Sequence, residues 1–486
     1  MSSLAPVFNI LSRILVGYAF LFLVPMAWAW QMDAMALLAV WVQSMAVTLV
    51  FGLTLWLLTS RFQRELMPRD GFLLVNLVWT VLPAFSAVPL VLAIDGLSWT
   101  DAYFEAMSGL TATGATAFSG LDGLPVSVNV WRCFLQLIGG LGVMLLVVAV
   151  LPLLGLGGVQ LYKAETPGPM KDARLTPRIA ETARGLWGVY FVFSTACMLA
   201  YHQAGMSWAD AFMHMCSTMG LGGFSSHDAS FAFWNSRDIE LVAIVFMALA
   251  GISFARYFIV WRSKSLRSMR RDPEVRAYLM ALIASVLGLA LLLLVHDTYA
   301  QPLDALRTAA FHVVSLATTT GYASADYSLW PVFAPVWLMF LGTFVSCAGS
   351  TGGGIKMVRM VLLVKQSRRE LVRAIHPRVV NPVTMGRTTI PATVIAAVMA
   401  FMLIYGASTI GLTMLMLLSG LDIVTAFSAV VATINNIGPG LGLVGPSSNF
   451  GVLSDFQTWV CTVAMLLGRL ELLAVIVLFV PHFWRK

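Results

Sequence analysis

The sequence predicts an all-α polytopic membrane protein, and three observations carry this prediction. Of the 486 residues, 59% are hydrophobic and only 11% are charged, whereas a soluble protein has about 25% charged residues. Long apolar runs recur, and the longest polar stretches between them, 157–184 and 356–387, hold about 30 residues each, too few for an independent core. Short glycine-centred segments recur four times in register. We therefore expect two leading transmembrane helices and four tandem repeats of helix, pore helix, filter and helix around a pseudo-four-fold central pore.

The two leading helices are expected at about 8–31 and 35–59. Each is long enough to cross a bilayer, which takes about 20 mainly apolar residues. Residues 14–30 also resemble a signal peptide, with Ala27-Trp28-Ala29 as a candidate cleavage site. The apolar run is long and a second span follows at once, which favours a retained transmembrane helix.

Four units follow, at about 71–157, 185–262, 277–364 and 390–483. With the polar loops included, the chain divides into a two-helix membrane domain and four pore repeats, at 1–60, 61–157, 158–262, 263–364 and 365–486. The short helix of each unit has about nine to twelve residues, roughly half a bilayer at 1.5 Å per residue. Such a segment cannot span the membrane, so it must enter and return on the same side.

The centre of each unit is a run of flexible backbone that ends in one glycine. The four runs are Thr111, Ala112, Thr113 and Gly114; Gly220, Leu221, Gly222 and Gly223; Thr318, Thr319, Thr320 and Gly321; and Asn435, Asn436, Ile437 and Gly438. Irregular backbone at membrane depth is tolerated only where it is buried in protein or lines a water-filled pathway. Four such runs around one axis predict an ion filter of backbone carbonyls. Ordinary helix-breaking glycines are the alternative, and four in register argue against it.

The distribution of charge predicts the topology. Lys and Arg cluster in segments 61–69, 163–184, 262–276 and 356–387, and the C-terminus adds Arg485-Lys486. The segments that follow the four glycines hold no Lys or Arg: 115–130, 224–236, 322–332 and 439–455. By the positive-inside rule the basic loops are cytoplasmic and the glycine hairpins open to the outside. The net charge of +7 is thereby explained without a nucleic-acid partner.

A run of small residues interrupts the last helix of the third unit: Gly349, Ser350, Thr351, Gly352, Gly353 and Gly354. Each Gly costs about 1 kcal/mol relative to Ala in a helix, so we expect a broken helix that lines a cavity. Close helix packing through small residues is the alternative.

Arg469 lies in the apolar last helix, where a buried arginine is costly and marks a functional candidate. A structural ion pair with Glu471 or another acid is the alternative reading. Glu471 is only two residues away, so the two side chains would not share a helix face.

Other polar residues give weaker indications of function. Asp101 and Asp210 are interpreted as helix N-caps, and Arg132 and Arg307 as arginines that snorkel to an interface. The histidines and the five cysteines have no metal-ligand spacing, and no phosphate loop follows a strand, so no organic cofactor is expected. A membrane-bound enzyme would need clustered His, Asp, Glu or Ser in the loops, which offer mainly Arg and Lys. The sequence therefore argues against an enzyme.

With their flanking residues, these motifs resemble TrkH/TrkG-type potassium-uptake subunits, in the superfamily that includes KtrB and the plant HKT transporters. The resemblance covers nearly the whole chain. It is carried by Ser108 to Thr116, Leu221 to Ser225, Thr318 to Tyr322, Ile434 to Gly440, Gly349 to Lys356 and Gly468 to Glu471. The two additional N-terminal helices and the segment 165–169 favour TrkH/TrkG over KtrB.

The resemblance implies that K⁺ is the transported ion, that Gly114, Gly223, Gly321 and Gly438 lie in the filter, and that residues 349–354 with Arg469 form the gate. Four glycines, rather than a serine in the first hairpin, imply a preference for potassium over sodium. Ala112 departs from the commonest first filter, Thr-Thr-Thr-Gly, which bears on selectivity.

The resemblance also implies a homodimer with one pore per subunit, in the bacterial inner membrane. It further implies a cytosolic TrkA-type nucleotide-binding ring that docks on the basic loops, although these loops are equally well explained as topology determinants. An alternating-access carrier that couples K⁺ to H⁺ or Na⁺ is the main alternative. Carriers often show inverted halves, whereas the four units here run in the same direction.

Overall fold

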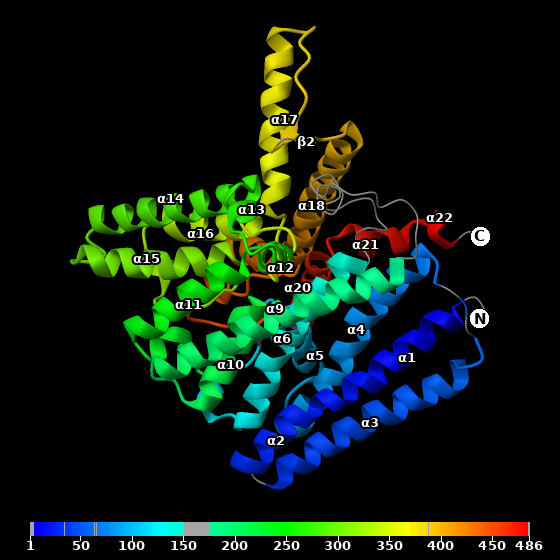
Figure 1. The fold of residues 1–486 in the computed structure, drawn as a ribbon. Helices are drawn as coiled ribbons and strands as arrows, with labels where there is room; N and C mark the ends of the chain where they lie inside the picture. Colours follow the sequence, from blue (N-terminus) through cyan, green and yellow to red (C-terminus); the bar gives the residue numbers. More distant parts are fainter. Residues whose placement is uncertain are drawn as a thin grey trace.

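The computed structural model describes residues 4–33, 35–62, 64, 66–149, 175–386 and 388–484, and it is almost entirely helical (Figure 1). Helix α1 (Ala5–Ala19) continues through the 3₁₀ turn η1 (Phe20–Phe22) into α2 (Leu23–Met32). Helix α3 (Met35–Thr59) then returns beside α1. The two leading helices predicted from the sequence are therefore present, and the all-α class is confirmed.

The first unit consists of α4 (Pro68–Ala93), α5 (Trp99–Leu110) and α6 (Val126–Ala149). The short helix α5 begins after Ser98, whose hydroxyl accepts a hydrogen bond from the amide of Asp101 (3.0 Å). Ser207 caps the short helix of the second unit in the same way, through Asp210. The prediction that Asp101 and Asp210 are the caps is therefore wrong. Each aspartate lies at the third helical position, where its carboxylate accepts from the serine hydroxyl (2.7 Å).

The second and third units contain nine helices between them within the described residues: α9 (Leu175–Gln203), α10 (Trp208–Gly220), α11 (Arg237–Ala250), α12 (Phe254–Ser263), α13 (Arg267–Arg270), α14 (Pro273–Val295), α15 (Pro302–Ala317), α16 (Phe333–Phe344) and α17 (Met357–Ile375). The sequence predicted one helix up to residue 262, but α11 and α12 meet at 84°. The segment before α17 satisfies the freed backbone groups, because Cys347 donates to the Gly251 carbonyl (3.0 Å) and Phe254 donates to the Gly349 carbonyl (3.1 Å).

The fourth unit contains α18 (Ala392–Leu418), α19 (Ile423–Ile434), α20 (Asp455–Arg469), α21 (Leu473–Ile476) and α22 (Pro481–Trp484). Its last helix is also broken, because α20 and the segment from Leu473 to Phe479 meet at 105°. Arg469 is therefore the last residue of α20, and the expectation that it lies within a continuous helix is wrong. Glu471 and Leu472 adopt positive φ angles of 55° and 50° in the break.

Seven described helices are long and apolar enough to cross a membrane, or nine if each of the two bent pairs forms one span. Helix α16, with 12 residues, is too short to be counted, since at 1.5 Å per residue it extends only about 18 Å. The segment 349–354 follows it, so the predicted interruption separates α16 from α17. The division into five domains at the predicted boundaries stays a prediction.

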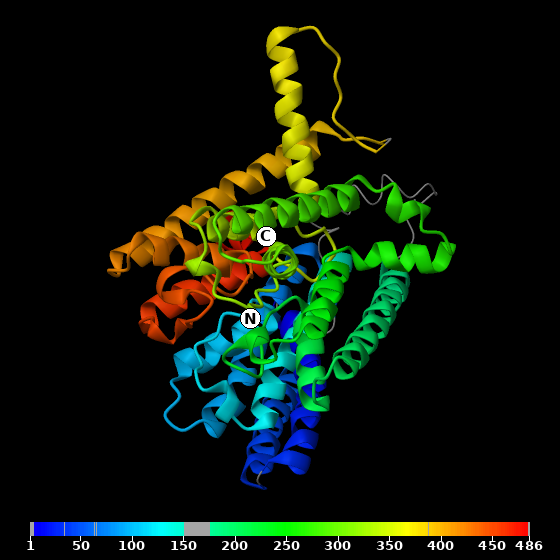
Figure 2. The same ribbon diagram turned by 90° about the vertical axis from the view of Figure 1, so that its left-hand side faces the viewer.

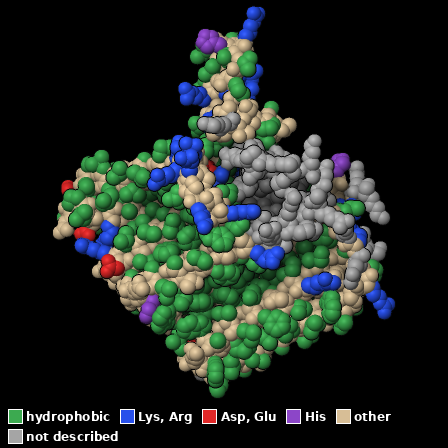
Figure 3. Space-filling model, viewed as in Figure 1, with side chains coloured by type: hydrophobic (Ala, Val, Ile, Leu, Met, Phe, Trp, Pro, Cys, Tyr) green, Lys and Arg blue, Asp and Glu red, His purple; other side chains and the backbone are tan. Residues whose placement is uncertain are grey.

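Helix α17 projects from the body of the molecule in both ribbon views (Figures 1 and 2). A short antiparallel hairpin, β1 (Thr384–Met385) and β2 (Thr388–Thr389), follows it before the chain enters α18. In Figure 3, Lys and Arg side chains gather mainly at the end of the molecule from which α17 projects, whereas the rest of the visible face is largely hydrophobic. The predicted basic loop at 163–184 lies mostly outside the described residues.

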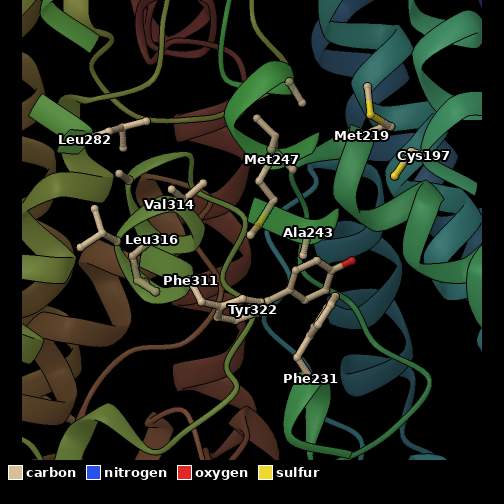
Figure 4. Close-up of a cluster of buried hydrophobic side chains, with 14 of the residues drawn as sticks. Cys197, Met219, Phe231, Ala243, Met247, Leu282, Phe311, Val314, Leu316 and Tyr322 are labelled. Atoms are coloured by element: carbon tan, nitrogen blue, oxygen red, sulfur yellow. The ribbon is translucent and has the colours of Figure 1, made fainter. Parts of the chain in front are cut away.

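The largest buried core joins the second and third units. Its centre includes Tyr322, which directly follows the third glycine hairpin and contacts Phe231 with a ring-centroid distance of 4.5 Å (Figure 4). Phe231 also contacts Phe311 of α15 (5.2 Å). The Tyr322 hydroxyl donates to the carbonyl of His214 in α10 (3.3 Å). These contacts fix the third hairpin against the short helix of the second unit.

Candidate functional site

The four short helices α5, α10, α15 and α19 end at the four predicted hairpins. The amide before each final glycine donates to the carbonyl oxygen five residues earlier, at Thr113–Ser108 (2.8 Å), Gly222–Ser217 (2.9 Å), Thr320–Ser315 (2.8 Å) and Ile437–Ala432 (2.8 Å). One backbone hydrogen-bond pattern is therefore used four times. Because the C-terminal end of a helix carries partial negative charge, each helix presents that charge beside its hairpin.

Left-handed backbone recurs at two positions of every hairpin. The final glycines have φ angles of 83°, 80°, 85° and 102°, at Gly114, Gly223, Gly321 and Gly438. The residues two positions earlier have φ angles of 49°, 53°, 65° and 54°, at Ala112, Leu221, Thr319 and Asn436. The angles of 49° to 65° lie in the small left-handed helical region that other residues can enter. The glycine angles of 80° to 102° lie beyond it, where a Cβ is costly, which explains the glycine at the end of each hairpin. Ala112 has the same backbone conformation as Thr319 and lacks only its hydroxyl-bearing side chain.

The final glycines lie in a closed ring, here called the glycine ring (Gly114, Gly223, Gly321 and Gly438). A Cβ atom on Gly114 would collide with the carbonyl oxygen of Gly222 in the second hairpin. The same collision would occur between Gly223 and Thr320, between Gly321 and Ile437, and between Gly438 and Thr113 (2.9 Å). Each glycine thus faces a carbonyl of the next hairpin, from the first to the fourth and back to the first.

Side chains join the hairpins to neighbouring elements. Gln136 of α6 donates from Nε2 to the Gly222 carbonyl (2.8 Å) and accepts from the Phe224 amide (3.1 Å), so its amide spans Gly223. Asn436 of the fourth hairpin donates from Nδ2 to Thr113 Oγ1 of the first (2.9 Å). The sequence analysis missed Gln136, whose signal was an amide side chain in the middle of the apolar helix after the first hairpin.

A fully buried ion pair lies behind the first hairpin. Arg132 Nη2 of α6 is 2.6 Å from Glu105 Oε1 of α5, and both side chains are 0% exposed. The prediction that Arg132 snorkels to an interface is therefore wrong, since its charge is neutralised inside the protein. Arg307 also pairs with an acid, Glu240 of α11 (3.6 Å), although its side chain remains 26% exposed. The sequence signal for Glu105 was a single acid in the buried half of a short apolar helix.

The predicted gate segment, 349–354, contacts the C-terminal ends of the short helices. Thr351 Oγ1 donates to the Met219 carbonyl of α10 (2.9 Å), and the Gly353 amide donates to Thr319 Oγ1 of the third hairpin (2.8 Å). A Cβ atom on Gly353 would collide with the Asn435 carbonyl beside the fourth hairpin. The segment therefore touches three of the four hairpin regions directly.

Arg469 contacts this segment rather than an acid. Its Nη1 donates to the Thr351 carbonyl (2.9 Å), and its Nε and Nη2 have no hydrogen-bond partner within the described part of the chain. Glu471, the suggested ion-pair partner, instead binds Arg359 at the start of α17. The side chain of Arg469 is buried, with 4% of its surface exposed. The structure therefore places Arg469 against the gate segment, which the buried Lys356 also contacts by donating from Nζ to the Gly352 carbonyl.

A polar cluster lies beyond the first two hairpins. His227 binds Asp122 through Nδ1, and its Nε2 lies 3.5 Å from Asp210 Oδ1. Asp228 accepts from the Leu121 amide (3.0 Å), which joins the same two loops. Burial opposes protonation of the imidazole, but its hydrogen bonds to Asp210 and Asp122 outweigh burial and raise the pKa of His227. Within the described residues, no group of three or more His, Cys, Asp or Glu side chains is arranged to hold a metal ion.

Together, the fold and this site define a polytopic helical membrane protein in which four short helices converge on one ring of backbone. The family model described as "TrkH: Cation transport protein" matches residues 38–486. The chain therefore belongs to the TrkH family of cation transport proteins, and the resemblance seen in the sequence is confirmed.

Relatives and a solved structure agree with this assignment. The Trk system potassium uptake protein TrkH of Halomonas elongata is 44% identical over 447 residues, which cover 92% of each chain. The protein of the same name from Escherichia coli K12 is 42% identical and covers 91% of this chain and 92% of its own length. The crystal structure of the potassium transporter TrkH from Vibrio parahaemolyticus has a TM-score of 0.92 and 39% identity, and the match covers 100% of both chains.

Proposed function

We propose that this chain is the pore-forming subunit of a bacterial potassium-uptake system, and that K⁺ crosses the membrane at the glycine ring. The observation that carries the proposal is the closed ring in which every glycine faces a carbonyl of the next hairpin. Four runs of backbone carbonyls around one axis can replace the hydration shell of a dehydrated cation. The names of the relatives, which are potassium uptake proteins, support potassium as the ion.

In this proposal each short helix assists the cation through its C-terminal partial charge. The side-chain bonds of Gln136 and Asn436 hold the hairpins at a fixed spacing. The segment 349–354 closes the path below the ring, and the charge of Arg469 repels cations there until the segment moves. Within the residues that the structure describes, its Nε and Nη2 groups have no hydrogen-bond partner, and this supports the role because a purely structural arginine would be expected to have these donors satisfied.

A coupled carrier is the second candidate, with K⁺ moving together with H⁺ or Na⁺. The broken pairs α11–α12 and α20–α21 favour it, since discontinuous helices at membrane depth are common in carriers. Reversal potentials distinguish the two functions. A pore reverses at the K⁺ equilibrium potential, whereas a symporter shifts its reversal potential when the H⁺ or Na⁺ gradient changes.

We further propose that the protein lies in the bacterial inner membrane with its hairpins outside, as a homodimer that binds a cytosolic TrkA-type nucleotide-binding ring. Helix α17 supports the docking of such a partner, because it projects from the body (Figure 2) and its sequence is strongly basic. Its basic side chains are Arg359, Lys365, Arg368, Arg369 and Arg373.

The test is rubidium and sodium flux into liposomes that contain the purified protein, with Gly114→Ser beside the wild type. We expect selective rubidium flux in the wild type and relaxed selectivity in the variant, because a side chain at Gly114 meets the Gly222 carbonyl. Gly120→Ser is the matched control, since Gly120 also has a positive φ angle (73°) but no atom within 4 Å of a Cβ. No rubidium flux in the wild type, with the cytosolic partner added, would overturn the proposal.

A further inference from the structure

The residue nine positions before each member of the glycine ring differs in chemistry among the four units. These residues are Glu105, His214, His312 and Ala429. All four are buried in the short helices. In the first three units the side chain hydrogen-bonds to the segment that leaves the hairpin, so the position acts as a brace for that segment.

The first unit uses a charged brace. Glu105 Oε1 accepts from Arg132 Nε (2.8 Å) and from Thr116 Oγ1 (2.9 Å), and Oε2 accepts from the Ala117 amide (3.0 Å). Thr116 lies two residues after Gly114. The carboxylate therefore holds the outgoing segment of the first hairpin through one hydroxyl and one amide.

The other units use neutral groups. His214 Nε2 bonds to Ser225 Oγ (3.0 Å), two residues after Gly223. His312 Nε2 lies within hydrogen-bond distance of the Ser324 amide (3.3 Å), three residues after Gly321. In the fourth unit Ala429 cannot make such a bond, and the adjacent Ser428 accepts from the Leu441 amide instead (2.9 Å).

Arg132 extends the charged brace to the second hairpin. Its Nη1 lies 3.4 Å from the Ser225 carbonyl, and its guanidinium packs over the Phe224 ring at 4.5 Å from the centroid. Ser225 is also the partner of His214, so the braces of the first two units meet at one residue. The pair is therefore coupled to two of the four hairpins.

We propose that Glu105 and Arg132 are specificity-determining positioning residues, which set the spacing of the first two hairpins and hence the preference among monovalent cations. This inference rests on the proposed function of the glycine ring as a filter. A buried ion pair often adds little net stability compared with apolar residues of similar volume. Among the described residues, the other three units have no ion pair at this position, so we infer that the pair in the first unit does more than stabilise the fold. Both carboxylate oxygens of Glu105 accept hydrogen bonds. Charge-assisted bonds of this kind hold the hairpin more rigidly than a single neutral hydrogen bond does.

The test measures the ratio of rubidium to sodium flux in liposomes for two variants. Thr116→Val removes the hydroxyl between the pair and the hairpin and leaves both charges paired. Glu105→Met with Arg132→Met removes both charges together, which avoids an unpaired buried ion. We expect each variant to lower the flux ratio about tenfold while total cation flux persists. Arg237→Gln is the control, because Arg237 is an arginine with a 71% exposed side chain and pairs with an acid on the protein surface.

The outcomes separate the two proposals. If the wild type carries no rubidium, the proposed function fails. If the wild type is selective and the two variants fold and retain its flux ratio, the pair is only structural and this inference is overturned. If the double variant does not fold, Thr116→Val decides alone, and a flux ratio equal to that of the wild type overturns the inference.

Discussion

Arg469, the last residue of α20, donates a hydrogen bond to the carbonyl oxygen of Thr351, 2.9 Å away in the segment between α16 and α17. The side chain of Thr351 in turn donates to the Met219 carbonyl at the end of α10 (2.9 Å). One threonine therefore connects the only guanidinium predicted for the site with the C-terminal end of a short helix. This connection makes the position of the segment sensitive to either residue.

Replacement of Arg469 by alanine should raise the basal cation flux. The change removes a charge-assisted hydrogen bond, worth about 1.5–3 kcal/mol, and removes the positive charge that opposes cations in the proposed function. A loss of about 1.4 kcal/mol corresponds to roughly a tenfold rise in the open population. The measurement is rubidium flux into liposomes without the cytosolic partner. Arg262→Ala, at an exposed position of α12, is the control. Unchanged or lower flux in folded Arg469→Ala protein would count against the gate.

Replacement of Thr351 by valine should also favour the open state, by a smaller amount. The variant keeps the shape of the side chain and loses one neutral hydrogen bond, worth about 1 kcal/mol, so we expect roughly a fivefold rise in basal flux. Ser350→Ala is the matched control, because the Ser350 hydroxyl donates only to Cys347 within the same segment (2.7 Å). Equal flux from the two variants would show that the bond to Met219 does not hold the segment closed.

The glycine ring was predictable from the sequence because a glycine recurs at the same place in four units. A φ angle of 85° at Gly321 favours glycine locally, whereas the second reason for a glycine there, the collision of a Cβ with the Ile437 carbonyl, is evident only in the folded chain. The length of the leading apolar runs likewise predicted their spans, as for α3 at Met35–Thr59, since bilayer thickness sets helix length.

The ion-pair partners of the buried arginines were not predictable, because tertiary contacts determine them. Arg132 meets Glu105 from the next helix of its unit, whereas Arg359 meets Glu471 from a different unit altogether. The break after Arg469 was missed for a similar reason. The sequence there contains no proline, and the close approach of Gly468 to the Ile434 carbonyl appears only in the folded chain.

Glu274 in the first turn of α14 should stabilise the segment between α16 and α17. Its Oε1 accepts from the amides of Ala348 (2.7 Å) and Val358 (3.2 Å), which lie on opposite sides of the segment. Glu274→Leu removes the acceptor and leaves two amides unpaired, so we expect a loss of about 2–3 kcal/mol in the free energy of unfolding. Glu274→Gln retains one acceptor oxygen, so its free energy of unfolding should fall by less. Thermal unfolding of the purified protein in detergent measures the difference. A melting temperature of Glu274→Leu equal to that of Glu274→Gln would contradict this role.

The cluster of His227, Asp122 and Asp210 should make the contact between the two loops that follow the first and second hairpins depend on pH. Since its hydrogen bonds raise the pKa of His227 in the folded protein, the stabilisation is complete below the ordinary histidine value of about 6.5 and is lost as the pH rises through the raised pKa. Burial opposes ionisation of Asp122, yet its bond to His227 lowers the pKa of that carboxyl below the ordinary 3.8. Its contribution is therefore complete above that value and is lost as the pH falls through the lowered pKa. The two conditions together place the greatest stabilisation between about pH 4 and pH 6.5.

His227→Gln should therefore lower the melting temperature more at pH 6 than at pH 9, because only the protonated imidazole attracts both carboxylates. Asp122 is 48% exposed, so solvent and salt screen part of this attraction, and the difference between the two pH values should shrink at high ionic strength. The measurement is thermal unfolding of the wild type and the variant at both pH values and at two salt concentrations. Asp122→Asn in the His227→Gln background should lower the melting temperature little further, since the two residues act as one pair. A pH-independent loss of stability on His227→Gln would mean that the stacking of the imidazole on Phe233, with ring centroids 3.5 Å apart, carries the effect instead of its charge.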